Sequence, residues 1–289
     1  MTRVLLLGAG GMLGHAIART APTQVEVLGP ALPRIDITDA DAVRAALASH
    51  RPRWVINAAA YTRVDDAERE PELAHRVNAL AVGALGTLCR ELGSGVVHVG
   101  SDYVFAGEAD RPYREDDATS PVNRYGASKL AGERALLESG ARALIVRTQW
   151  LFGSPGRSFP RTMWERARAA LPTRVVADQT GRPTLTDDLA RAIWRLVALD
   201  AEGIVHAAND GTATWYEVAR AVHEAAGAPT LVSACTSADY PTPARRPRYS
   251  VLDTARLESL LGGPLPPWPD ALARFLAQLR DVESATAPK

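Results

Sequence analysis

The chain has 289 residues, of which 46% are apolar and 23% are charged. This composition is ordinary for a globular protein with a large core and excludes a disordered chain. The 33 basic residues balance 33 acidic ones, which argues against a nucleic-acid partner. No apolar run approaches the roughly 20 residues of a membrane-spanning helix, and the stretch 4–7 is too short for the core of a signal peptide.

Cysteine and lysine are both scarce. Cys89 and Cys235 are far apart in the chain, so neither a disulfide framework nor a cysteine-ligated metal site is expected, and the expected location is the cytoplasm. Of the 33 basic residues only Lys129 and the last residue, Lys289, are lysines. Because lysine and arginine are not chemically interchangeable, the one interior lysine is either a functional residue or a chance remnant.

Strands and helices are predicted to alternate over the first 150 residues. Short apolar runs predict strands at 3–7, 25–28, 54–57, 96–99 and 143–146. Helical spacing predicts helices at 12–20, 39–49, 71–92 and 121–138. The alternation predicts an α/β fold, a doubly wound parallel sheet with helices on both faces.

The pattern loosens after Trp150. Helices are predicted at 158–170, 186–199, 214–226, 253–261 and 270–279, strands at 174–177 and 203–206, and a proline-rich loop at 229–249. We expect a first domain over 1–150 and a smaller lobe over 151–289, with segments between about 185 and 225 returning to the first domain.

A glycine-rich loop lies between the first predicted strand and the first predicted helix. Gly8, Gly11 and Gly14 fit the spacing G-x-x-G-x-x-G. Such glycines let the backbone approach a pyrophosphate that sits on the helix N-terminus, although glycine triplets also form ordinary turns. Because this loop follows a strand and opens a helix, the sequence favours dinucleotide binding.

The second predicted strand bears on the choice of dinucleotide. It ends Val27-Leu28-Gly29, without the carboxylate that commonly binds the ribose 2′-hydroxyl of NAD. Arg34 follows a few residues later and either meets the 2′-phosphate of NADP or is a solvated loop charge. The sequence therefore favours NADPH and leaves NADH open.

Tyr125 and Lys129 lie four residues apart near the start of a predicted helix, and hence on one helix face. A nearby ammonium is expected to lower the tyrosine pKa from its ordinary value of about 10, so that the phenol can exchange a proton near neutrality. A surface tyrosine beside a solvated lysine is the alternative. Ser101 follows the strand at 96–99, which places its hydroxyl where ligands bind in open α/β sheets.

Together these stretches resemble the extended short-chain dehydrogenase/reductase superfamily and, within it, the dTDP-4-dehydrorhamnose reductase family. The resemblance follows the family's order over residues 8–14, 57–68, 101–105, 120–133, 147–153, 178–184 and 240–247. It implies a Rossmann-type NAD(P)-binding domain and a smaller C-terminal substrate-binding lobe. The implied activity is the NAD(P)H-dependent reduction of the C4 keto group of a dTDP-4-keto-6-deoxy-L-sugar, either dTDP-4-dehydro-L-rhamnose or a closely related deoxysugar.

The resemblance also implies roles for individual residues. Tyr125 is the expected proton donor, Lys129 is expected to hold the nicotinamide ribose, and Ser101 stands where the family usually has threonine. The expected cofactor contacts are Gly8, Gly11, Met12, Leu13, Gly14, Asp36, Ile37, Ala60, Tyr61, Thr62, Tyr125 and Lys129. The expected substrate contacts are Ser101, Asp102, Trp150 and Arg246, with Arg245 and Arg248 as alternatives to Arg246 at the diphosphate.

Two departures from related proteins limit what is implied. Some members of the family form a dimer bridged by magnesium on glutamates, one of them at the position of Ala16, so we expect a monomer or a homodimer without a bound metal. Related dehydratases carry Asp-Glu after the hydroxyl residue, whereas Asp102 is followed by Tyr103, so an epimerase or dehydratase is the weaker alternative. A non-catalytic regulatory subunit of methionine adenosyltransferase is a third alternative, against which the joint presence of Ser101, Tyr125 and Lys129 argues.

Overall fold

A parallel sheet forms the centre of the larger domain. The structure is a computed structural model that describes residues 1–29 and 35–286, so Arg34 lies outside the described residues. Six parallel strands lie side by side in the order β10 (Gly203–His206), β5 (Ala143–Thr148), β4 (Gly95–Ser101), β3 (Trp54–Asn57), β1 (Thr2–Leu7) and β2 (Val25–Leu28). The sheet confirms the predicted α/β class.

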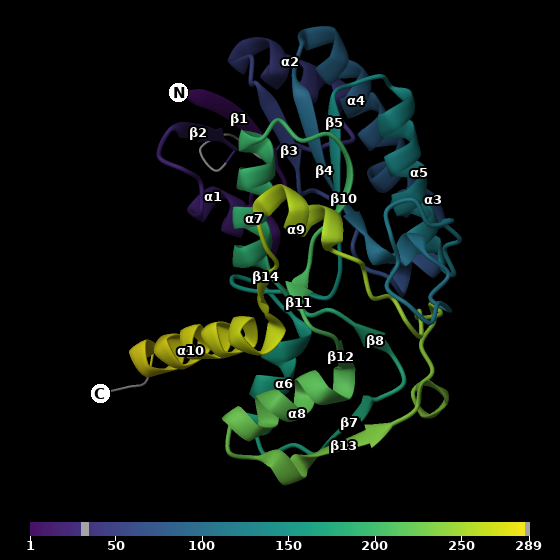
Figure 1. The fold of residues 1–289 in the computed structure, drawn as a ribbon, viewed down its shortest axis with the longest axis vertical. Helices are drawn as coiled ribbons and strands as arrows, with labels where there is room; N and C mark the ends of the chain where they lie inside the picture. The colour runs from purple at the N-terminus through teal and green to yellow at the C-terminus, as the bar shows by residue number, and fades with distance from the viewer. Residues whose placement is uncertain (30–34, 287–289) are drawn as a thin grey trace.

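Helices cover both faces of this sheet, as Figure 1 shows. One face carries α1 (Met12–Arg19), α7 (Thr186–Ala198) and α9 (Ala255–Leu261), and the other carries α2 (Ala40–His50), α4 (Ala81–Leu92) and α5 (Arg124–Glu138). Successive side chains of β1 enter opposite cores: Val4 and Leu6 pack toward α1 and α7, while Leu5 and Leu7 pack toward α2 and α4. Burial on both faces explains why these strands are continuous apolar runs in the sequence.

Two segments from the second half of the chain complete the sheet and its cover. Strand β10 pairs in parallel with β5 at the edge of the sheet, and α7 packs against α1. Trp194 of α7 is buried there, and its indole N–H donates to the backbone carbonyl of Ile17 over 3.0 Å. The C-terminal half of the sequence therefore contributes directly to the core of the first domain.

A smaller lobe lies at one end of the molecule (Figure 1). Its helices are α6 (Phe159–Arg168), α8 (Trp215–Ala225) and α10 (Trp268–Thr286), which pack around the buried Phe152 and Phe275. Short two-stranded sheets connect its loops, pairing β7 (Thr173–Val176) with β13 (Val232–Cys235), β8 (Thr180–Gly181) with β12 (Ala213–Thr214), β6 (Leu151–Phe152) with β9 (Thr184–Leu185), and β11 (Asn209–Asp210) with β14 (Leu265–Pro267). No helix among the described residues combines the length and apolar character needed to cross a bilayer.

The structure corrects three predicted elements. The helix predicted at 71–92 is interrupted: α3 (Pro71–His75) continues as a π-helical turn over Arg76–Leu80 before α4 begins. The helix predicted from residue 121 begins at Arg124, because the side chain of Asn123 accepts a hydrogen bond from the Gly126 backbone N–H and caps it. The region 229–249, predicted as loop, contains β13, which a two-stranded pairing with β7 stabilises from a distant part of the sequence.

Candidate active site

The glycine-rich loop connects β1 to α1 at the carboxyl end of the sheet. Gly8 has a positive φ of 79°, and a Cβ there would overlap the backbone of Ala59, while a Cβ on Gly14 would overlap the Gly8 carbonyl oxygen. Only glycine fits these two positions. By contrast, a Cβ on Gly10 would meet no atom within 4 Å, so the outer side of the loop is open.

This open side has the features that a phosphate requires. Helix α1 begins at Met12 with Gly11 as its cap, and no side chain caps its first backbone N–H groups. Uncapped N–H groups at a helix N-terminus attract anions, and the glycines allow close approach of a phosphate to the backbone. The loop therefore fits the pyrophosphate of a dinucleotide.

The other residues expected to contact a cofactor follow the carboxyl ends of β1, β2 and β3. Their exposure differs: three are buried (Leu13, Ile37 and Tyr61), two are half-buried (Met12 and Ala60), and two are exposed (Asp36 and Thr62). The carboxylate of Asp36 accepts hydrogen bonds from the backbone N–H and the hydroxyl of Thr38 at 2.9 and 2.8 Å. The sheet order β3-β1-β2 brings these three loops to neighbouring positions along one edge.

Ser101 and Tyr125 meet at the end of β4. Ser101 is the last residue of β4, and Tyr125 lies in the first turn of α5, where Asn123 fixes the start of the helix. The ring of Tyr125 packs edge-to-face on Tyr103, with 5.6 Å between ring centroids. Burial raises the pKa of Tyr125 to about 12, while hydrogen bonding with the Ser101 side chain acts to lower it.

Asp102 is a buried acid next to this pair. One carboxylate oxygen accepts a hydrogen bond from the Ser101 hydroxyl at 3.1 Å, and the other, Oδ2, has no hydrogen-bond partner among the described residues. Burial raises the pKa of Asp102 to about 7, although hydrogen bonds from Ser250 and Ser101 oppose the rise. The Oδ2 atom is thus an unpartnered acceptor enclosed by protein, and the raised pKa makes the protonation of the carboxyl group sensitive to pH near neutrality.

Lys129 lies one helical turn after Tyr125 and is almost completely buried, with 2% of its surface exposed. Its Nζ donates to the backbone carbonyl of Val99 over 2.7 Å and lies 3.4 Å from Nε2 of His98. Burial lowers the pKa of Lys129 to about 8, and the nearby carboxylate of Glu133 only partly offsets this. The lysine is therefore positioned inside the site, in contrast to the alternative of a solvated surface charge.

The expected lowering of the Tyr125 pKa by Lys129 is wrong for the free protein. Burial of the phenol raises its pKa, and the negative charge of Asp102 raises it further. The lysine amine contacts Val99 and His98, and its own burial disfavours the ammonium form that was expected to stabilise a phenolate.

A π-helical turn ties Tyr61 to the helix that carries Tyr125. Asn78, buried within this turn, accepts from the Tyr61 backbone N–H at 2.8 Å and donates to the Tyr61 carbonyl and to the Ser128 hydroxyl at 3.0 Å each. Ser128 in turn donates to the carbonyl of Tyr125 over 2.7 Å. The π-helical turn thus fixes a predicted cofactor-binding loop against the predicted catalytic helix.

The residues expected to contact substrate are divided between the two parts of the molecule. Trp150 has a positive φ of 48° and stacks face to face on Trp215 at the start of α8, with 3.6 Å between ring centroids. Arg246 is half-buried and donates to Asp65 over 2.9 Å. Burial raises the pKa of Tyr103, and Arg246 lies close enough to oppose part of that rise.

The alternative arginines are more exposed. Arg245 forms an exposed ion pair with Glu108 at 3.0 Å, and Arg248 is exposed. Of the three candidates, Arg246 is therefore the one held beside Tyr103, with guanidinium N–H groups to spare for a second anion.

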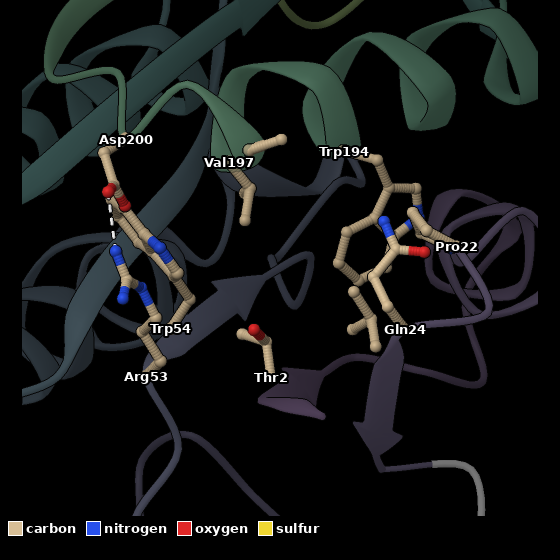
Figure 2. A pocket seen from close by; sticks show the side chains of 10 residues that line it. Thr2, Pro22, Gln24, Arg53, Trp54, Trp194, Val197 and Asp200 are labelled. Carbon is tan, nitrogen blue, oxygen red and sulfur yellow. Dashed lines mark hydrogen bonds and ion pairs between the residues drawn. The ribbon is translucent and has the colours of Figure 1, made fainter.

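A cavity of about 160 Å³ lies elsewhere, at the amino end of the same sheet (Figure 2). Thr2, Val25 and Trp54, which line it, begin β1, β2 and β3, and an ion pair of 2.6 Å between Arg53 and Asp200 borders it. Ser101 and the glycine loop lie at the carboxyl ends of the strands. This cavity is therefore separate from the candidate active site.

Several residues of the site were not predicted from the sequence. His98 and Asn57 lie beneath Lys129 in β4 and β3, Asn78 forms the π-helical turn, and Trp215 covers Trp150. The available signal was polarity: His98 and Asn57 are polar residues inside otherwise apolar strands, and Asn78 is a buried amide. From the sequence alone, a buried polar residue of this kind fits a functional role and a structural role equally well, because its hydrogen-bond partners are not known.

Comparison with known proteins gives a consistent assignment. The model of the RmlD substrate binding domain family matches residues 1–281. A dTDP-4-dehydrorhamnose reductase of Mycolicibacterium smegmatis is 46% identical over 280 residues, which cover 95% of this chain and 85% of that protein. A probable dTDP-4,6-dihydroxy-2-methyloxan-3-one 4-ketoreductase of Streptomyces antibioticus is 44% identical over 97% of both chains.

A solved structure agrees with this assignment. The dTDP-4-dehydrorhamnose reductase of Bacillus anthracis in complex with NADP superposes with a TM-score of 0.90 at 33% identity, covering 96% of this chain and all of that one. The match thus extends through both the sheet domain and the smaller lobe. The chain belongs to the RmlD substrate-binding domain family.

Proposed function

We propose that this protein is an NADPH-dependent reductase of the C4 keto group of a dTDP-4-keto-6-deoxy-L-sugar. The observation that carries the proposal is the meeting of the Ser101 and Tyr125 side chains at the carboxyl end of β4, on the same sheet edge as an open glycine loop. Relatives at 46% and 44% identity are a dTDP-4-dehydrorhamnose reductase and a probable dTDP-sugar 4-ketoreductase, which supports the same chemistry.

In this proposal the polar side chains have separate tasks. The hydroxyls of Ser101 and Tyr125 hold the carbonyl oxygen of the sugar, and Tyr125 donates its proton as negative charge develops on that oxygen. A phenol whose pKa is raised to about 12 remains protonated at neutral pH and is therefore ready to donate. The nicotinamide, when bound, supplies the hydride.

The cofactor is held by the glycine loop and by the loops after β2 and β3. The uncapped N-terminus of α1 receives the pyrophosphate, and Lys129 holds the nicotinamide ribose near Tyr125. We assign NADPH as the preferred cofactor because β2 ends at Leu28 and Gly29 follows, without a carboxylate for a free 2′-hydroxyl. NADH is the alternative that the assay below decides.

The substrate lies between the sheet domain and the smaller lobe. Asp102 and Trp150 contact the sugar nucleotide, and Arg246 binds the diphosphate. We also propose that the boundary between the cofactor-binding domain and the substrate-binding lobe lies near residue 150. The protein is further proposed to be cytoplasmic and to be a monomer or a homodimer.

The decisive experiment is a panel of dTDP-linked 4-keto-6-deoxy sugars tested with NADPH and with NADH. We expect stoichiometric consumption of NADPH with a ketone substrate, and NMR of the product then assigns the configuration at C4. Dehydro-rhamnose is the first candidate, and the relative from Streptomyces antibioticus makes a more specialised deoxysugar the second. Turnover of a sugar nucleotide without net NADPH consumption would identify an epimerase or dehydratase instead.

A further inference from the structure

A chain of buried polar groups runs from the cofactor-binding loop to Lys129. The backbone N–H of Ala59 donates to Asn57 Oδ1 over 3.1 Å, and Asn57 Nδ2 lies 3.1 Å from Nδ1 of His98. On the other side of the imidazole, Nε2 lies 3.4 Å from Lys129 Nζ. Asn57, His98 and Lys129 are each at most 2% exposed, so water does not satisfy these groups.

The direction of every hydrogen bond in this chain follows from its first member. A backbone N–H can only donate, so the side chain of Asn57 must turn its oxygen toward Ala59. Its amide NH₂ then faces His98, and Nδ1 of the imidazole must be the unprotonated acceptor. A neutral imidazole with a bare Nδ1 carries its proton on Nε2, and this N–H faces Lys129.

Lys129 can complete the chain only in one protonation state. An uncharged amine has one lone pair, which accepts the N–H of His98, and it still donates an N–H to the carbonyl of Val99. An ammonium has three donors and no acceptor, so it would set an N–H against the N–H of His98. Reversing the imidazole or the Asn57 amide only moves this donor–donor contact to Asn57 or to Ala59.

We propose that His98 is a positioning residue for Lys129, and that its Nε2–H, oriented through Asn57 by the backbone of Ala59, favours the uncharged amine in the free protein. This inference rests on the proposed function, because it concerns the residue that holds the nicotinamide ribose. It also bears on Tyr125: the further the pKa of Lys129 falls, the smaller is the fraction of ammonium that could stabilise a phenolate, and the phenol keeps its proton. The loop at Ala59 is thereby linked to Lys129 and Tyr125 through residues of β3, β4 and α5.

The charged and titratable groups around Lys129 are few. His98 faces it from β4, Tyr125 precedes it by one turn of α5, and Glu133 follows by one turn. The carboxylate of Glu133 is bound to Arg147 of β5 at 2.8 Å, and both side chains are buried. Burial, and secondly the charge of Lys129 in its ammonium form, hold the pKa of His98 well below its usual range, so the imidazole stays neutral across the working pH range.

The amino-acid sequence offers a direct measurement of this lysine. Because the 289-residue chain contains only Lys129 and Lys289 as lysines, biosynthetic ¹³C-lysine labelling gives two Hε–Cε signals in an NMR spectrum. The Lys129 signal is the one that disappears in the Lys129→Arg variant. In the cofactor-free protein, we expect this signal to report a Lys129 pKa that is lower than the ordinary lysine value of about 10.4 by about one unit or more.

The variant that tests the role of His98 is His98→Gln, whose amide oxygen can accept from an ammonium. We expect the pKa of Lys129 to rise by about one unit or more, since the opposing N–H is removed. His206→Gln is the matched control: His206 is also a fully buried histidine of the same sheet, but its Nδ1 contacts the Tyr113 carbonyl, and the pKa of Lys129 should not move. Equal effects of the two substitutions, or no effect of His98→Gln, would overturn the proposal.

A second measurement needs no variant to fold. Long-range ¹H–¹⁵N spectra of the assigned His98 ring show which nitrogen carries the proton, and we expect Nε2–H with a bare Nδ1. The Nδ1–H form would overturn the proposal. Reductase activity is assayed separately on the wild type: activity with an ordinary lysine pKa refutes this inference alone, while a low lysine pKa in a protein that reduces no keto-sugar refutes the proposed function alone.

Discussion

Replacing Lys129 by methionine should stabilise the free protein at neutral pH while abolishing its proposed activity. The pKa of Lys129 is lowered from 10.5 to about 8 by burial, so at pH 7 the folded state carries a buried ammonium at a cost of about 3 kcal/mol relative to the unfolded chain. Methionine has a similar length without a charge, and its cost is the lost hydrogen bond to the Val99 carbonyl, about 1–2 kcal/mol. The expected net stabilisation is about 1–2 kcal/mol at pH 7.

The stabilisation by Lys129→Met should diminish as pH rises. Between the folded pKa of about 8 and the unfolded value of 10.5, the unfolded chain binds more protons, so the wild type gains stability as pH rises through this window. From pH 7 to pH 9.5 the penalty falls by about 2 kcal/mol, and the advantage of Lys129→Met should disappear.

Urea unfolding at pH 7 and 9.5 measures both effects. Arg134→Met is the matched control, since Arg134 is an exposed cation on the same helix and remains charged at both pH values. A lysine variant that is less stable than the wild type at pH 7, or whose difference from it is the same at both pH values, would refute the reasoning from burial.

Three further outcomes are expected. Tyr125→Phe should lower kcat by about 10²–10⁴-fold, measured by NADPH consumption, and leave NADPH affinity nearly unchanged because only a proton donor is lost; unchanged turnover would contradict its assignment. Glu133→Gln should destabilise the protein by about 3–5 kcal/mol in chemical unfolding, because it breaks a buried ion pair with Arg147. Glu91→Gln, which breaks an exposed ion pair with Arg44, should cost about 1 kcal/mol or less. Equal losses of stability in the two variants would show that burial does not decide the cost. Gly10→Ala should weaken NADPH binding in calorimetry without loss of stability, because its methyl group enters open space on the loop. Gly14→Ala should lower both the NADPH affinity and the melting temperature, because its methyl group overlaps the loop backbone. If both variants bound NADPH as well as the wild type, the phosphates would have to bind elsewhere.

The sheet was predictable because its signal is local. Strands β1, β3, β4 and β5 are mainly apolar runs that are buried on both faces, and α2 and α5 begin at side-chain caps. Strand β13 was missed because its four residues are held by pairing with β7, nearly 60 positions earlier, and not by any property of their own. The π-helical turn was missed for a similar reason: the residues at 76–80 are ordinary helix formers, and the contacts of Asn78 with Tyr61 and Ser128 accompany the widened turn.

For the candidate site as well, features set by nearby residues were predictable from the sequence, and features set by residues far apart in the chain were not. Gly8, Ser101, Tyr125 and Lys129 were identifiable because their spacing relative to a strand or helix end already restricts what they can do. The state of Tyr125 was not, because its pKa depends on how completely neighbouring elements enclose the phenol and on the charge of Asp102. The spacing of Tyr125 and Lys129 predicted that they lie one helical turn apart, but it gave the wrong direction for the shift of the Tyr125 pKa.

The buried polar groups explain why this difference matters for catalysis. A solvated lysine beside a tyrosine would hold a permanent ammonium and a permanently acidified phenol, whereas burial lowers the lysine pKa to about 8 and raises that of the phenol to about 12. In the free protein at neutral pH the phenol therefore keeps its proton, while the lysine is an ammonium whose pKa lies only about one unit above neutrality. Under the proposed function, a ligand whose hydroxyl groups accept hydrogen bonds from Lys129 would favour the ammonium further. Because burial disfavours the charged forms of both groups at the end of β4, we expect ligand binding to be coupled to the protonation of Lys129: the buried charge that lowers the stability of the free protein is the one that a bound ligand would stabilise.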